Sequence, residues 1–156
     1  MNFNIRHGNK KVGVTFGVEI AFDMIKIEHL GIAVKELGVS VPLFEQLLNT
    51  PCYKTEVVAT EGVSTAFFQT GESKIELLEA TNENSPIAKF IAKKGEGIHH
   101  IAFAVENIEA EMKRLSALGF ELLNETPKNG ADNKLVCFLH PKSTNGVLIE
   151  LCQDRP

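Results

Sequence analysis

Cysteine is scarce in this sequence, and the few cysteines present follow no metal-binding pattern. Cys52, Cys137 and Cys152 are odd in number and show no CxxC or zinc-finger spacing. This argues against a zinc module and against a disulfide-stabilised secreted domain. We interpret them as core thiols in a reducing compartment, and we predict a cytoplasmic protein.

Long apolar runs and basic clusters are also missing. No stretch approaches the roughly 20 apolar residues of a membrane-spanning helix, so no membrane contact is expected. Acidic residues outnumber basic ones, 20 to 16, and no basic cluster is interleaved with aromatic side chains. Nucleic acid is therefore an unsuitable partner.

The first 23 residues have no counterpart in the second half of the chain. They begin basic and become moderately apolar, as in a signal peptide, but Thr15 and Glu19 interrupt the apolar region and no A-x-A site follows. We therefore expect an N-terminal extension of uncertain role at residues 1–23 and a single domain at residues 24–156.

What the sequence does contain is a pattern that occurs twice. Residues 27–34 read IEHLGIAV and residues 98–105 read IHHIAFAV, so His29 and His100 occupy equivalent places. The segment SKIELLEA, with Glu76, is likewise echoed by GVLIELCQD, with Glu150. Such repeats indicate a duplicated module. If the halves pack around a pseudo-twofold axis, these four side chains converge on one point.

The histidine segments alternate in the manner of β-strands, in which every second residue shares a face. The face of each histidine is predicted to carry mainly small residues, which leaves room for a ligand: Ile27, Gly31 and Ala33 beside His29, and Ile98, Ala102 and Ala104 beside His100. His99 is predicted on the opposite face, with Phe103, in a structural role. Glu28 stands in its place in the first copy.

Glu76 and Glu150 are each flanked by an isoleucine and a leucine, so both are carboxylates inside apolar strands. A buried carboxylate is costly unless it is paired, protonated or bound to metal. A lone histidine in a strand is more often a hydrogen-bonded core residue, and a lone glutamate usually faces solvent. The recurrence of both in register favours a four-ligand metal site. Mixed imidazole and carboxylate ligands suit Co, Mn, Ni, Fe or Zn better than calcium.

The remaining pattern predicts two tandem βαβββ modules, at about 24–80 and 97–154. In the first, a helix at 39–48 is followed by strands at 54–59, 64–69 and 74–79. A linker helix at about 85–95 begins at Ser85-Pro86 and ends at Gly95. In the second module, a helix capped by Asn107 ends at Gly119 and precedes strands at 120–125, 134–140 and 146–152.

This organisation resembles the vicinal-oxygen-chelate superfamily, in which paired βαβββ modules form cupped sheets around one divalent metal. The resemblance implies an α+β fold with a barrel-like mixed sheet, helices on the outside, and the metal ligands His29, Glu76, His100 and Glu150. The segments SPIAKFIAKKGEGIHHIAFAV and FLHPKSTNGVLIEL resemble methylmalonyl-CoA epimerases more closely than glyoxalase I. Glyoxalase I usually carries a DPDG-like turn where this chain has His140-Pro141-Lys142.

The resemblance to the epimerases implies a reaction and roles for individual residues. It implies metal-dependent epimerisation of (2R)/(2S)-methylmalonyl-CoA through an enolate, with a CoA thioester as substrate, and a homodimer is expected. Glu150 is the favoured catalytic base, and Glu76 or a water molecule is the alternative, because Thr65 stands where some epimerases carry a separate glutamate. His140 and Lys142 are expected either to contact the substrate carboxylate or CoA phosphates, or to form a solvated turn.

Two other functions share this pattern. A glyoxalase I-type lactoylglutathione lyase would use a similar His/Glu/His/Glu set on a glutathione hemithioacetal. A non-catalytic small-molecule-binding member of the superfamily would be expected to lose metal ligands, whereas this sequence keeps four candidates.

Overall fold

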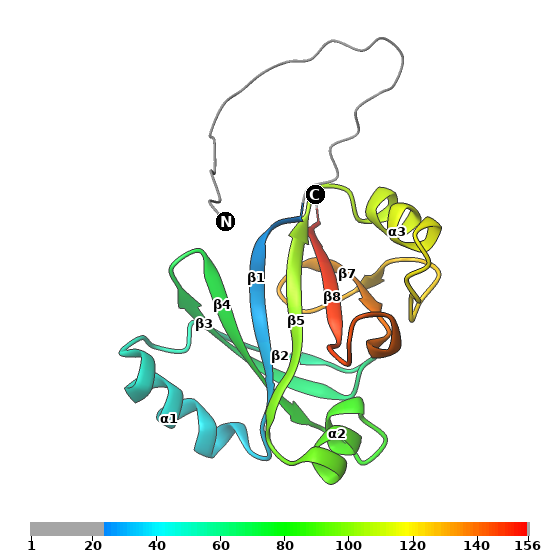
Figure 1. The fold of residues 1–156 in the computed structure, drawn as a ribbon. Helices are drawn as coiled ribbons and strands as arrows, with labels where there is room; N and C mark the ends of the chain where they lie inside the picture. Colours follow the sequence, from blue (N-terminus) through cyan, green and yellow to red (C-terminus); the bar gives the residue numbers. More distant parts are fainter. Residues whose placement is uncertain (1–23, 156) are drawn as a thin grey trace, which may run out of the picture.

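The computed structural model describes residues 24–155, and the expected N-terminal extension lies outside them. The described chain forms one curled eight-stranded sheet with three α-helices (Figure 1). The elements are β1 (Met24–Ala33), α1 (Leu37–Leu48), β2 (Lys54–Val58), β3 (Val63–Thr70), β4 (Ser73–Ala80), α2 (Pro86–Lys94), β5 (Gly97–Val105), α3 (Ile108–Ala117), β6 (Lys128–Asn129), β7 (Lys134–Leu139), the 3₁₀ turn η1 (Pro141–Ser143) and β8 (Ile149–Asp154). Within residues 24–155, no helix has the length and apolar character needed to cross a membrane.

The sheet has the same arrangement on both sides of its centre. Its strand order is β2-β3-β4-β1-β5-β8-β7-β6. The two histidine strands, β1 and β5, pair antiparallel in the middle, and each pairs in parallel on its outer side, β1 with β4 and β5 with β8. The predicted α+β class and the cupped mixed sheet built from two similar halves are confirmed.

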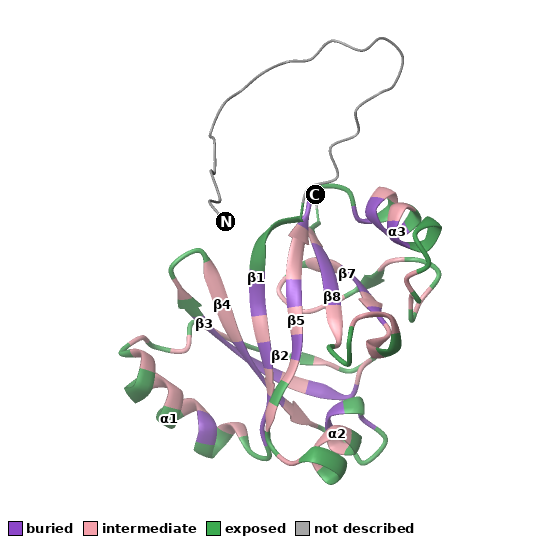
Figure 2. Ribbon diagram, in the orientation of Figure 1, coloured by how far each residue is buried: buried purple, intermediate pink, exposed green. Residues whose placement is uncertain are grey.

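Two helices cover the face of the sheet that points away from the candidate site. α1 packs Phe44 and Leu48 against Phe68 and Leu77, and α3 packs its apolar side against Cys137, Leu139 and Leu151. α2 differs, because its Ile87 contacts Val63 and Leu78 at the rim of the cavity described below. Figure 2 shows buried segments running along the central strands, with exposed residues on the outer sides of the helices.

Local signals in the sequence explain where the helices begin. The Ser85 side chain accepts a hydrogen bond of 3.2 Å from the amide of Ile87, and the Asn107 side chain accepts one of 3.0 Å from Ala110. α1 begins at Leu37, two residues earlier than its apolar pattern predicts. There the Glu79 carboxylate of β4 accepts the Leu37 amide at 2.6 Å, which satisfies a donor that the helix itself leaves free.

The strand predicted at 120–125 is wrong, because only Leu122 forms a β-bridge, with Leu139. The Asn124 side chain accepts the amide of Phe138 at 3.3 Å and donates to the carbonyl of Thr126 at 2.6 Å. A side chain thus occupies the donor that a longer ladder would use. The short edge strand β6 forms farther along the chain.

Candidate metal and active site

Two imidazoles and two carboxylates from the four central strands converge at the bottom of the cup. The Nε2 atoms of His29 and His100 lie 2.9 Å apart. Glu76 Oε2 lies 3.2 Å from His29 Nε2 and 3.7 Å from His100 Nε2, and Glu150 Oε2 lies 3.7 Å and 3.1 Å from the same atoms. All four residues are buried. The structure therefore brings together the four side chains that the repeat predicts.

Small residues on the opposite strand make room for each ring. His29 pairs with Ala102, and His100 pairs with Gly31. A Cβ atom at Gly31 would lie 2.2 Å from Cε1 of His100, so only glycine admits the ring at this position. The predicted lining of small residues has a steric reason.

The strict alternation predicted for the histidine strands is wrong at two places. Ile27 pairs with Phe103 and His29 with Ala102, which leaves Glu28 as an extra residue in β1; the next irregularity leaves His99 as an extra residue in β5. Such β-bulges redirect side chains and are frequent beside active sites. Ile27 and Ile98 are consequently exposed, by 45% and 62%, while Glu28 and His99 line the cavity.

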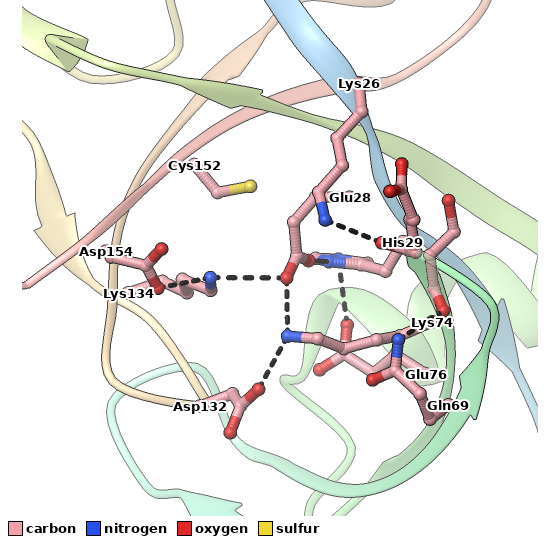
Figure 3. Close-up of polar contacts among 12 residues, drawn as sticks. Lys26, Glu28, His29, Gln69, Lys74, Glu76, Asp132, Lys134, Cys152 and Asp154 are labelled. Carbon is pink, nitrogen blue, oxygen red and sulfur yellow. Dashed lines mark hydrogen bonds and ion pairs between the residues drawn. The ribbon is translucent and has the colours of Figure 1, made fainter.

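The residue before each histidine contacts its Nδ1 atom. The Glu28 carboxylate accepts from Nδ1 of His29, and His99 Nδ1 lies 3.0 Å from His100 Nδ1. Glu28 is itself held by Lys74 and Lys134, as Figure 3 shows. His99, predicted to lie on the opposite face, is therefore part of the surroundings of the site.

Two of the four side chains, His29 and Glu150, have strongly shifted pKa values. Burial alone would lower the pKa of His29, but its three carboxylate neighbours outweigh burial and raise this pKa well above its ordinary value. Burial alone would raise the pKa of Glu150, but His100 and His29 outweigh it and hold this pKa well below its usual range. The Glu150 carboxylate therefore stays ionised beside the two imidazoles.

This donor set fits a divalent metal ion. One ligand atom each from His29, His100 and Glu150 lies within 4.8 Å of the others, and Glu76 adds a second carboxylate oxygen at 3.2 Å from His29. The Nδ1 atom of each imidazole contacts the preceding residue, Glu28 or His99. Such contacts fix the direction in which Nε2 points, as in many metal sites.

The four side chains lie in a cavity of about 250 Å³. Apolar side chains form much of its walls: Val63, Phe67 and Leu78 from the first half, and Val136, Phe138 and Leu148 from the second. Such walls exclude water and strengthen electrostatic interactions inside.

The other predicted site residues lie at different distances from this centre. Thr65 is buried in the cavity wall, and its hydroxyl donates to the carbonyl of Glu56 at 3.3 Å. His140 and Lys142 lie outside the residues that line the cavity, and His140 Nδ1 accepts the amide of Lys142 at 3.0 Å. A contact of these two with CoA phosphates, beyond the cavity, stays a prediction.

Known proteins are similar to this chain over most of its length. Residues 28–138 match the model of the Glyoxalase/Bleomycin resistance protein/Dioxygenase superfamily. The chain is 37% identical over 132 residues to an uncharacterized protein of Bacillus subtilis, covering 85% of this chain and 94% of the relative. It is 39% identical over 130 residues to an ethylmalonyl-CoA/methylmalonyl-CoA epimerase of Cereibacter sphaeroides, covering 82% and 97%.

A solved structure of a methylmalonyl-CoA epimerase is also similar to this chain. A variant of Streptomyces coelicolor methylmalonyl-CoA epimerase in complex with 2-nitronate-propionyl-CoA is similar with a TM-score of 0.79 and 34% identity, over 83% of this chain and 97% of that one. The chain therefore belongs to the Glyoxalase/Bleomycin resistance protein/Dioxygenase superfamily and, within it, to the family of the methylmalonyl-CoA epimerases.

Proposed function

We propose that this protein is a metal-dependent epimerase that interconverts (2R)- and (2S)-methylmalonyl-CoA through an enolate. The observation that carries the proposal is the convergence of His29, Glu76, His100 and Glu150 in one cavity, in a chain 39% identical to an epimerase of this substrate class. We also propose that the protein acts in the cytoplasm, which its three unpaired cysteines support.

The four converging residues would hold one divalent ion, with Co, Mn, Ni, Fe and Zn as candidates. When bound, such an ion supplies Lewis-acid chemistry that makes the hydrogen between a carboxylate and a thioester carbonyl more acidic. With His29, Glu76, His100 and Glu150 as its protein ligands, such an ion would still be able to bind the two oxygens of a malonyl unit.

The protein supplies the proton transfer. Glu150 is buried in the cavity and is held ionised by His100 and His29, so it can accept a proton from the branched carbon. Glu76 is the alternative base. Thr65 carries no carboxylate at the position where some epimerases have one, so these two glutamates remain the nearest candidates. Removing the proton from one face and returning it to the other inverts the centre.

The cavity supports a small acyl group as the reacting part of the substrate. At about 250 Å³ it lies just below the range of pockets that enclose whole drug-sized ligands. The branched malonyl unit fits inside, while the nucleotide portion of CoA stays outside.

The test compares two substrates on protein reconstituted with one metal after chelation. We expect epimerisation of methylmalonyl-CoA, incorporation of deuterium at C2 in deuterated water, and no isomerisation of a glutathione hemithioacetal. Elemental analysis should find one metal per chain, which His100→Ala and Glu150→Ala should lose. Hemithioacetal isomerisation without epimerase activity would instead identify a glyoxalase, and full metal occupancy in both variants would exclude this site.

A further inference from the structure

We propose that Glu28 is a positioning residue, whose carboxylate, anchored by Lys74 and Lys134, fixes the imidazole of His29 for metal binding. The inference deepens the proposed function and rests on it, because it takes His29 as a metal ligand. It assigns a purpose to the ionic cluster around the buried Glu28, which the four ligands leave unexplained.

Both oxygens of the Glu28 carboxylate are used. Oε2 accepts from Nδ1 of His29, and Oε1 lies 2.5 Å from Nζ of Lys74 and 3.3 Å from Nζ of Lys134. Glu28 is only 3% exposed. Figure 3 shows its carboxylate between the two ammonium groups, with the imidazole of His29 directed on toward Glu76. The Nδ1–carboxylate contact leaves Nε2 directed at the four-residue cluster.

The backbone explains how two consecutive residues reach the same cavity. Because Glu28 is the extra residue between the pairs Ile27–Phe103 and His29–Ala102, its side chain escapes the alternation that would direct it to the opposite face. The bulge thereby brings the carboxylate beside the ring that follows it.

Each lysine is in turn held by a second carboxylate. Lys74 Nζ lies 2.7 Å from Asp132 Oδ2, and Lys134 Nζ lies 2.5 Å from Asp154 Oδ1. Glu28 cannot rotate away from His29 without leaving two largely buried ammonium groups incompletely paired, which is unfavourable. The orientation of the ring is therefore set by a cluster that draws on both halves of the sheet.

A second cation between Glu28, His29 and Cys152 would also use these groups, whose ligand atoms lie within 4.8 Å of one another. Two ammonium groups already neutralise Glu28, and their charge repels a cation. The Cys152 thiol donates to the carbonyl of Phe103 at 3.4 Å. The geometry thus favours a hydrogen-bonded support over another metal site.

A carboxylate behind a ligating histidine fixes its tautomer and raises the basicity of the ligating nitrogen, and losing it typically weakens metal binding about 10- to 100-fold. We expect that loss in Glu28→Gln, which keeps the shape but removes the charge. Glu28→Asp, which restores the charge on a shorter side chain, should recover part of it. Glu56→Gln is the matched control, since Glu56 pairs with Lys54 at 2.7 Å in the same network but contacts neither site histidine.

The primary measurement is the Kd for zinc, by competition with a chelator. A second is the Nδ1–H proton resonance of His29 in the zinc-loaded protein, which should be strongly downfield and slow to exchange in the parent and in Glu56→Gln, but displaced in Glu28→Gln. Circular dichroism melts without zinc check the fold of each variant. If Glu28→Gln does not fold, Lys74→Met replaces it, because it weakens the anchor while keeping Glu28 and His29, and it should give a smaller loss of affinity.

The outcomes are distinct. An unchanged Kd and an unchanged resonance in the folded variant overturn the role of Glu28, even if the parent is an active epimerase. If the parent binds zinc but does not epimerise methylmalonyl-CoA, the reaction assignment fails, and the Kd of Glu28→Gln still decides the role of Glu28. A parent that binds none of the candidate ions, zinc included, overturns both the role of Glu28 and the metal-dependent reaction. Two zinc ions in the parent and one in Glu28→Gln would reveal the second cation site in place of the support.

Discussion

The two halves of the sheet present their histidines to the site in the same way but support them differently from behind. In both, a bulge in the strand directs the preceding residue toward the histidine. In the first half this residue is Glu28, anchored by two lysines. In the second it is His99, whose ring packs edge-on against Phe90 at a centroid distance of 4.9 Å. The two halves share the bulge in the backbone, but they differ in the side chain that contacts the histidine, a carboxylate in one and an imidazole in the other.

The difference is one of charge. Burial, together with the neighbouring His100, lowers the pKa of His99 to about 4, so this imidazole is neutral near pH 7. Attraction to His29 and Lys74 overcomes the burial of Glu28 and holds its pKa well below its usual range, so this carboxylate is ionised. His29 therefore has an anionic neighbour at its Nδ1 atom, and His100 has a neutral one.

The largest effect is expected on turnover, when the ligand carboxylates of the two halves, Glu76 and Glu150, are compared. Glu150→Gln can still offer an amide oxygen to a metal but cannot accept a proton, so turnover should fall by about 10²- to 10⁴-fold, the usual contribution of general acid–base catalysis. Glu76→Gln should lose less, since Glu76 is only the alternative base. Rates are measured on both variants with the metal content determined.

Equal losses in the two glutamine variants would remove the asymmetry, and near-normal turnover of metal-loaded Glu150→Gln would exclude Glu150 as the base. Attention would then move to Glu76 or to a water molecule. The substrate is the same in both assays, so the comparison isolates the position of the carboxylate.

The sequence predicts the four converging side chains because a duplication reveals them without any knowledge of packing. It does not predict the positions of Glu28 and His99, because alternation assumes an uninterrupted ladder and the bulges are visible only in the strand pairing. The cluster around Glu28 was missed for a related reason. Lys74 and Lys134 lie far apart in the chain and look like ordinary strand lysines until the sheet is assembled. The one signal is that Lys134 begins an otherwise apolar strand, KLVCFL.

A medium effect, on stability, is expected at Asp132, in the turn between β6 and β7, because its side chain contacts residues of the first half. Asp132 accepts from Lys74 at 2.7 Å, from Lys54 at 3.2 Å and from the Tyr53 hydroxyl at 3.3 Å. Asp132→Asn should lower the free energy of unfolding by about 1.5–3 kcal/mol, the usual range for hydrogen bonds to charged groups. Asparagine tolerates the left-handed backbone found here, with φ 51°, so backbone strain adds nothing.

The matched control is another ion pair between the two halves, in which the first half supplies the carboxylate. Glu61 and Lys128 form an ion pair of 3.8 Å with both side chains more than a third exposed, so Glu61→Gln should change stability little.

Burial alone would raise the pKa of Asp132, but Lys74 and Lys54 outweigh it and lower this pKa below 3.8. Its stabilisation is present above the unfolded pKa and is lost as the pH falls through the folded one. Urea unfolding at pH 7 and pH 3 should show the difference between parent and Asp132→Asn shrinking in acid; a constant difference would contradict an ionic cause.

The smallest effect concerns the two outer helices, which follow the histidine strands at equivalent places. α3 buries Ile108, Met112 and Leu115, whereas α1 leaves a stripe of Val39, Leu43 and Leu47 that is 66%, 59% and 70% exposed. If this stripe faces solvent, Leu43→Gln should change the free energy of unfolding by less than about 0.5 kcal/mol. Urea unfolding of dilute protein measures this, and light scattering gives the mass of each protein.

Leu115→Ala is the reference for a covered helix face, because it creates a cavity in the core of the second half and should cost about 2–5 kcal/mol. Leu43→Gln should leave the mass unchanged as well as the stability. A loss approaching that of Leu115→Ala, together with a smaller mass, would contradict a solvent-facing stripe. It would locate on α1 the interface of the homodimer that the resemblance to the epimerases predicts. Both helices would then have covered apolar faces, that of α3 by the sheet and this stripe of α1 by a second copy of the chain.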